Sequence, residues 1–578
     1  MADLALRAAI VVSRFAAARA AASQPVRSTD PVNQPPSTCS FNREDIPSPI
    51  DDNRTMDSRS FLLAQARAND RDGDLQGAEI LYRGFLAECP DHIEATWALG
   101  RLLVRRGDLV AGIAILYRAA DLSPASPGIL ADLGAALGQA GQEQPAQLAL
   151  LTALCLNAIA VNPGDIEARF HLGMTLHQAG RTRFAIGAFR EAIALCPDFA
   201  ELHNNLGIFL QSMLRNKEAV TAHRRAVALA PWNAGHHCNL AHAALAAGAL
   251  REGFAEWEWR PLSPPRDFPQ PKWDGAAFAG KTLLAHAEQG FGDTLQFCRY
   301  LPAAAALGGR VIVECRAPLV SLLARMPGVA QVIPWGEPLP PFDLQIPIPS
   351  LAHVLGHDED HRADHGFSDP PARPAAPHRG DMSRRPYLTA DPARIDRWRA
   401  RAARDGRRRV GLVWAGNAAG RDPLRAIPPD ALARLAEIPG IALIGCQRDG
   451  PDSGGRIGLA EDWGAEITDF DDLAGAIATL DLLISVDTAA AHLAGALGHP
   501  VWILLHAAPD WRWQGGEAAM DGQQDERGGP CRWYPSMRLY RQNQAGDWEG
   551  LVSRVATALR HWADGHQTAD RMGTIASS

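Results

Sequence analysis

Asp487 and Thr488 directly follow an apolar run, and a helix of small residues starts right after them, in LLISVDTAAAHLAGALGHP (482–500). This pattern predicts a buried parallel strand that feeds a helix through a tight turn. Ligands of open α/β sheets bind at such strand ends, and a helix N-terminus favours phosphate. Both residues also suit the N-cap of a helix, so capping alone is an alternative explanation.

A second loop whose residues could take part in chemistry is EQGFGDT (288–294), at the end of a predicted strand over 282–288. Gly290 and Gly292 permit a close backbone turn, and Asp293 opens the next predicted helix. The GxGxxG dinucleotide fingerprint is incomplete, because no glycine stands three residues after Gly292. Asp293 is therefore a candidate general base, with an N-cap role as the alternative.

Two further motifs have more ordinary explanations. GAAFAGKT (275–282) matches the P-loop pattern, but a proline-rich stretch precedes it where a P-loop needs a strand. Asp469-Phe470-Asp471 resembles a metal-binding DxD, but it precedes a helix-like run, which favours helix capping.

Length and composition indicate a multidomain globular protein. The chain has 578 residues, of which 47% are hydrophobic and 21% charged, with a net charge of −8. An acidic chain is not expected to bind nucleic acid. The nine cysteines form no CxxC pair, so we expect no metal and a reducing cytoplasmic location. We expect no transmembrane segment and a disordered region over 1–58.

The first half of the chain repeats itself with a period of 34 residues, apart from one insertion of five. The repeated positions are a proline, a Leu-Gly or Leu-Ala pair and a turn glycine, and the prolines are Pro90, Pro124, Pro163, Pro197 and Pro231. Each unit reads as helix, turn, helix, proline. About six such units over 60–260 resemble tetratricopeptide repeats, which stack into a solenoid.

Stacked repeats of this kind present a concave face that suits an extended peptide. Asn205 and Asn239 occupy the same position in successive repeats and are candidate peptide ligands. Packing between repeats and solvation are the alternatives for both asparagines.

The second half alternates strand-like and helix-like runs, which is the pattern of a parallel sheet. A proline-rich linker precedes it, and a long polar stretch over 356–385 divides it into two α/β lobes. We expect a ligand cleft between the lobes. The predicted strands are 282–288, 310–315, 329–334, 409–415, 442–447, 482–487, 501–505 and 537–541.

EQGFGDTLQFCRYLP, GLVWAGN (411–417) and SVDTAAAHLAGALGHPVW, in this order, resemble the family nine, heptosyltransferase-like glycosyltransferases. The whole layout resembles bacterial proteins that carry tetratricopeptide repeats before such a domain. The resemblance implies a GT-B fold of two Rossmann-like lobes. The expected divisions are a disordered segment 1–58, repeats 59–262, an acceptor lobe 263–388, a donor lobe 389–565 and a disordered tail 566–578.

The resemblance also implies roles for individual residues. Asp293 would be the catalytic base, and Asp487, Thr488 and His492 would belong to the donor-phosphate loop. Arg425 is our candidate for stabilising the leaving diphosphate. The remaining nucleotide-sugar-binding residues implied are Gly290, Gly292, Asn417 and Gln447.

The resulting expectation is an inverting, metal-independent transferase that moves sugar from a nucleotide-sugar donor to a protein or glycan acceptor. The repeats would recruit the acceptor or a protein partner. The nucleotide sugar is a substrate, so no cofactor is expected, and the inner membrane face is an alternative location. The alternative function is a non-catalytic repeat scaffold with a degenerate transferase domain.

Overall fold

The computed structural model describes residues 58–575, except 263–265, 289, 357–384, 403–404, 417–424, 449–453 and 515–528. The chain divides into two units, residues 1–65 and 66–578. In the first unit only residues 58–65, the start of helix α2, are described. All contacts below belong to the second unit.

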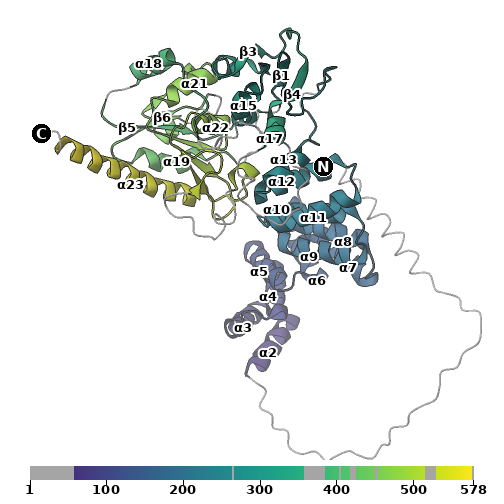
Figure 1. The fold of residues 1–578 in the computed structure, drawn as a ribbon. Helices are drawn as coiled ribbons and strands as arrows, with labels where there is room; N and C mark the ends of the chain where they lie inside the picture. Colours follow the sequence, from purple (N-terminus) through teal and green to yellow (C-terminus); the bar gives the residue numbers. More distant parts are fainter. Residues whose placement is uncertain are drawn as a thin grey trace, which may run out of the picture. The chain divides into compact units, whose positions relative to one another are not determined.

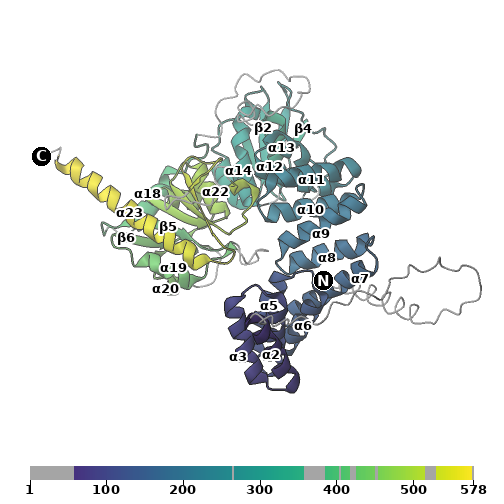
Figure 2. The same ribbon diagram turned by 90° about the horizontal axis from the view of Figure 1, so that it is seen from below.

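Six helix–turn–helix units make up the first part of the described chain, which confirms the predicted helical repeats. Their helices are α2 (Ser58–Asp72) and α3 (Leu75–Glu88), α4 (Ile93–Arg105) and α5 (Leu109–Leu122), α6 (Pro127–Gln139) and α7 (Glu143–Val161), α8 (Ile166–Gln178) and α9 (Thr182–Leu195), α10 (Ala200–Ser212) and α11 (Asn216–Leu229), and α12 (Ala234–Ala247) and α13 (Leu250–Trp257). In Figures 1 and 2 the pairs from α8 to α12 stack side by side.

The turn inside each unit requires a left-handed backbone. Glycine supplies it in five units, for example at Gly107, where φ is 88°. The fifth unit instead has Leu214 there, with φ 59°, which is an unusual conformation for a branched side chain. The five-residue insertion lies in α7, which has 19 residues where α5, α9 and α11 have 14.

The first α/β lobe contains a four-stranded parallel sheet in the order β3-β2-β1-β4. The strands are β1 (Thr282–His286), β2 (Arg310–Cys315), β3 (Val329–Pro334) and β4 (Leu344–Pro347). The helical segments between the strands are α14 (Phe291–Phe297), η1 (Cys298–Tyr300), α15 (Leu301–Ala305), η2 (Ala317–Leu319) and α16 (Val320–Leu323). After β4 come η3 (Ile348–Ser350) and α17 (Leu351–Leu355). The single helix expected to start at Asp293 is thus interrupted after α14 by the 3₁₀ turn η1.

The second lobe contains a seven-stranded sheet in the order β10-β11-β9-β8-β5-β6-β7, in which only β10 is antiparallel. The strands are β5 (Arg408–Val413), β6 (Ile441–Gly445), β7 (Glu461–Asp462), β8 (Leu482–Val486), β9 (Val501–Leu505), β10 (Gly529–Pro530) and β11 (Met537–Arg541). The helical segments are α18 (Pro392–Arg401), α19 (Pro429–Ala436), α20 (Gly454–Ile457), η6 (Gly464–Glu466), α21 (Phe470–Ile477), α22 (Ala489–Ala496), η7 (Trp511–Trp513) and α23 (Trp548–Ile575).

Alternate residues of the second sheet face two different cores, as expected for a strand period of two. Leu482 and Ile484 pack in the core that contains α19 and α23, whereas Leu483 packs in the core that contains α21 and α22. Helices therefore cover both faces of this sheet (Figure 1). Helix α23 continues to Ile575, which differs from the disorder expected from residue 566.

The order of the parallel strands explains where a ligand would bind. Along the chain, β5, β6, β7, β8, β9 and β11 take the spatial order 3-2-1-4-5-6, which is that of a doubly wound, dinucleotide-binding sheet. The direction of winding reverses between β5 and β8. The first sheet follows the order 3-2-1-4, so its reversal lies between β1 and β4. The carboxyl edges at these two points are the ligand positions favoured by topology.

Helices α12 and α13 share one core with both lobes. Phe254 and Trp257 of α13 contact Phe297 of the first lobe and Trp511 of the second, with ring centroids 5.5–6.2 Å apart. The last repeat thus packs together with the α/β lobes, although the sequence predicted a domain boundary between the repeats and the first lobe at residue 262.

Candidate active site

The two chemical loops identified in the sequence lie against each other. Helices α14 and α22, which follow these loops, are in contact. A Cβ atom added at Gly292 would lie 3.0 Å from Cδ2 of His492, so only glycine allows this approach without displacement. The fold therefore brings the Asp293 loop and the Asp487 loop together from opposite sheets.

Asp293 sits in the first turn of α14 and not at its N-cap, which is Gly290. Its Oδ2 accepts the Gly290 amide at 3.2 Å, and its Oδ1 is ion-paired with Nη2 of Arg512. The side chain is 17% exposed. A carboxylate has about four acceptor positions, so both oxygens can accept a further hydrogen bond.

Asp487 follows β8 and meets Arg425, which comes from the segment after β5. Nη1 of Arg425 lies 2.8 Å from Oδ2 of Asp487. Burial raises the pKa of Asp487, and the Arg425 guanidinium opposes that rise. This ion pair spans the reversal point between β5 and β8. Arg425 is 37% exposed, so a ligand arriving at the edge can reach it.

Other predicted donor residues lie along the same edge. Thr488 is the N-cap residue of α22, but its hydroxyl contacts Ser485 Oγ at 3.0 Å and makes no capping bond. The Gln447 side chain accepts the Ala415 amide at 3.1 Å, which ties the end of β6 to the segment after β5. Asn417 lies outside the described residues.

His492 is an interior residue of the contact between the lobes. It is 4% exposed, its Nδ1 lies 2.9 Å from the Tyr534 hydroxyl, and its ring packs on Trp513 at 4.8 Å. Burial and the nearby Arg512 lower its pKa to about 3, so the ring is neutral. His492 therefore joins the two loops, and this position gives it no direct access to a ligand.

Two buried arginines that the sequence analysis did not assign hold the first loop. Nε of Arg260, three residues after α13, donates to Glu288 at 2.6 Å, and its Nη2 donates to Ser350 Oγ at 2.9 Å. Because Glu288 follows β1 and Ser350 follows β4, Arg260 occupies the reversal point of the first sheet. Burial raises the pKa of Glu288, and Arg260 opposes this effect.

Arg512 of η7 is the second arginine. Besides Asp293, it donates through Nε to Gln296 Oε1 at 2.7 Å and through Nη1 to Asp510 Oδ1 at 2.9 Å. Arg512 belongs to the segment PDWRW (509–513). The pairing with Asp293 joins residues 219 positions apart, and no local pattern announces it.

The two asparagines of the repeats make bonds inside the array. Asn205 Nδ2 donates to the Glu201 carbonyl in its own helix at 2.8 Å. Asn239 Nδ2 donates to Asn204 Oδ1 of the preceding unit at 2.9 Å, and that oxygen also lies 3.2 Å from His223 Nδ1. These bonds fit the packing alternative, and peptide binding by these asparagines stays a prediction.

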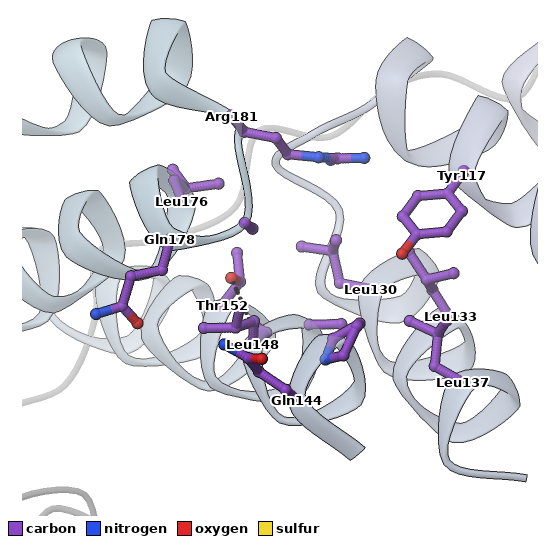
Figure 3. Close-up of a pocket in the computed structure, with 13 residues that line it drawn as sticks. Tyr117, Leu130, Leu133, Leu137, Gln144, Leu148, Thr152, Leu176, Gln178 and Arg181 are labelled. Carbon is purple, nitrogen blue, oxygen red and sulfur yellow. Dashed lines mark hydrogen bonds between the residues drawn. The ribbon is translucent and has the colours of Figure 1, made fainter. Parts of the chain in front are cut away.

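The array also contains a pocket of about 290 Å³ beside the lengthened helix α7. Figure 3 shows leucine side chains of α6, α7 and α8 around it, with Tyr117 and Arg181 at its margin. Arg181 is bonded to the Ala120 carbonyl and to Asp121. The pocket is therefore mainly apolar, and its nearest charge is already paired.

Within the described ranges, no group of three His, Cys, Asp or Glu side chains is placed to hold a metal ion. One described helix, α7, has the length and hydropathy of a membrane span, and 28% of that window is buried. This likeness to a span rests on length and composition alone. Asp469 caps α21 by accepting the Asp472 amide at 2.7 Å. This capping role is the one that the sequence favoured over a metal-binding DxD motif.

Comparison with known proteins gives a partial match. No family model matches the chain. Protein FlbA of Caulobacter vibrioides is 30% identical over 341 residues, which cover 55% of this chain and 54% of FlbA. The chain thus spans about half the length of the relative that it matches.

Among solved structures, MamA is 23% identical to this chain, with a TM-score of 0.17. The match covers 30% of this chain and 91% of MamA. YrrB, described as a TPR protein with an unusual peptide-binding site, is 20% identical with a TM-score of 0.16, covering 30% of this chain and 86% of YrrB. Neither TM-score indicates that the whole chain shares the fold of these proteins.

Proposed function

We propose that this chain is a glycosyltransferase that moves a sugar from a nucleotide-sugar donor to a protein or glycan acceptor. The observation that carries the proposal is the Arg425–Asp487 pair at the reversal point of a dinucleotide-type sheet, adjacent to the Asp293 loop. The Arg425–Asp487 pair suits a nucleoside diphosphate, and the carboxylate of the neighbouring Asp293 loop suits a general base.

In the proposed reaction, the Asp293 carboxylate takes the proton of the acceptor hydroxyl while that oxygen attacks the anomeric carbon. The bond from the anomeric carbon to the diphosphate breaks, and the nucleoside diphosphate leaves with the electron pair. Arg425 would then stabilise the negative charge on the leaving group. Asp487 repels phosphate, so its role in this proposal is to hold Arg425 in position.

The helical array would recruit a protein acceptor or partner through its concave face. A non-catalytic scaffold is the second candidate, because ion pairs already give Asp293 and Asp487 a structural role. The pocket beside α7 supplies that candidate with an apolar surface in the array.

Thermal unfolding of the purified chain with ADP, UDP, GDP, CDP and dTDP tests the choice between the two. A ligand at 100 times its dissociation constant adds about 2.7 kcal/mol to the stability of the domain that binds it. The transferase predicts a selective shift that is reduced in Asp487→Ala, because Arg425 loses its position. No shift with any of the five would favour the scaffold.

A further inference from the structure

The stretch from Glu288, after β1, to Asp293, in the first turn of α14, is held at both ends by buried arginines. Arg260 bonds Glu288 at the start, and Arg512 bonds Asp293 at the end. Arg260 comes from the last repeat, and Arg512 comes from the second lobe. Neither arginine belongs to the lobe whose loop it holds.

Both guanidinium groups lie near one indole ring, that of Trp257 in α13. The Cζ atom of Arg260 is 4.9 Å from the ring centroid, and that of Arg512 is 5.7 Å away. Trp257 is 4% exposed, and a cation near an aromatic ring is held more strongly where water is excluded. The Trp257 indole is therefore placed to hold both arginines at once.

Other contacts fix this indole. Trp257 packs against Phe297 of the first lobe at 5.5 Å and against Trp511 of the second at 5.8 Å. Its backbone carbonyl accepts Nη1 of Arg260 at 3.0 Å. A change in α13 would therefore affect both Glu288, through Arg260, and Asp293, through Arg512.

We infer that Trp257 is a positioning residue for Asp293, and that through it the last repeat sets the geometry of the candidate site. Trp257 acts on Glu288 through Arg260 and on Asp293 through Arg512. The role given to Asp293 rests on the proposed function, whereas the positioning itself rests on the contacts alone.

Hydrogen–deuterium exchange of the full chain tests the positioning without a substrate. We expect Trp257→Leu to speed amide exchange in α14 by about 10-fold or more and Trp257→Phe, which keeps an aromatic face, by less. Trp97→Leu is the matched control, because Trp97 is an array tryptophan with the Arg101 guanidinium 5.6 Å from its ring. It should leave exchange in α14 unchanged.

Exchange in α14 that is unaltered in Trp257→Leu, or raised equally in Trp97→Leu, would overturn the inference. If Trp257→Leu does not fold, Arg260→Lys replaces it, since lysine keeps the charge but not the planar fork. The same rise in α14 is then expected, and its absence overturns the inference.

A second readout separates the inference from the proposed function. With a donor identified by its nucleotide, Trp257→Phe should lower turnover but leave the dissociation constant of the nucleoside diphosphate unchanged. Wild-type chain that binds no nucleoside diphosphate would contradict the proposed function, and the exchange result would still decide the positioning of the loop.

Discussion

The two sheets share the strand order 3-2-1-4, but the acidic residues at their carboxyl edges are paired by arginines from different parts of the chain. At the first edge, Arg260 and Arg512 reach Glu288 and Asp293 from outside the lobe, and all four side chains are at most 17% exposed. At the second edge, Arg425 comes from the same lobe as Asp487, and its side chain is 37% exposed. The first edge is therefore assembled by three parts of the chain, and the second is assembled by one.

This difference fits a division of labour between the edges. A group that accepts a proton must be held in one orientation, which buried pairs on two sides can provide. A site that takes up and releases a charged ligand needs a cation that can exchange partners. The first edge has the properties of the former, and the second has those of the latter.

The largest expected effect of this difference is on the free energy of unfolding when an arginine is removed from either edge. Arg512→Leu leaves the partly buried carboxylates of Asp293 and Asp510 without their partner, and we expect a loss of about 3–5 kcal/mol in unfolding free energy. Arg425→Leu removes a half-exposed partner from one carboxylate instead of two, so it should cost less, about 1–3 kcal/mol. Urea unfolding followed by tryptophan fluorescence measures both losses. Equal losses would remove the contrast between the edges.

The next effect concerns turnover. Asp293→Asn should reduce sugar transfer by at least about 100-fold, because an amide cannot take the acceptor proton, whereas nucleotide binding should stay unchanged. Asp469→Asn is the matched control, since Asp469 is also ion-paired at a helix start, with Arg394 of α18. Unchanged transfer in Asp293→Asn would remove Asp293 from the mechanism.

The contact between the edges should also make stability depend on pH. Burial lowers the pKa of His492 to about 3, below the ordinary value of 6.5, so the unfolded chain binds the proton more readily. Stability should therefore fall as pH drops below about 6.5, by about 1.4 kcal/mol per unit for each such histidine.

Burial also lowers the pKa of His223 to about 3 and the pKa of His286 and of His499 to about 4, and it lowers the pKa values of His177, His236 and His242. His492→Gln should make the fall between pH 6.5 and 5 shallower by about 2 kcal/mol. Unfolding free energies measured at both pH values in the two proteins test this. An equal slope in wild type and variant would contradict a neutral, buried His492.

Local patterns sufficed to predict the repeats, most strands and the two acidic loops. The apolar run before Asp487 and the glycines before Asp293 mark these loops without any tertiary information. Strand β4 was missed because Leu344–Pro347 is only four residues long and bounded by proline. The break in the helix after α14 was also missed.

The residues that complete the first edge could not be found in this way. Arg260, Trp257 and Arg512 act through pairings that close only when the last repeat and both lobes pack together. The segments that contain them are EWEWR (256–260) and WRW (511–513), and no local pattern relates these segments to Glu288 or Asp293. At the second edge, by contrast, Arg425 was predicted beside the donor loop, and the structure pairs it with Asp487.

We expect the second edge to bind the nucleotide and the first edge to make no contribution to that binding. Isothermal titration of the nucleoside diphosphate that gives the largest thermal shift tests this in wild type, Arg425→Gln and Asp293→Asn. A charge-assisted hydrogen bond contributes about 1.5–3 kcal/mol, so Arg425→Gln should weaken binding by about 10-fold or more. Asp293→Asn should bind like wild type. Equal affinity in wild type and Arg425→Gln, or absence of binding in the wild type, would contradict the account.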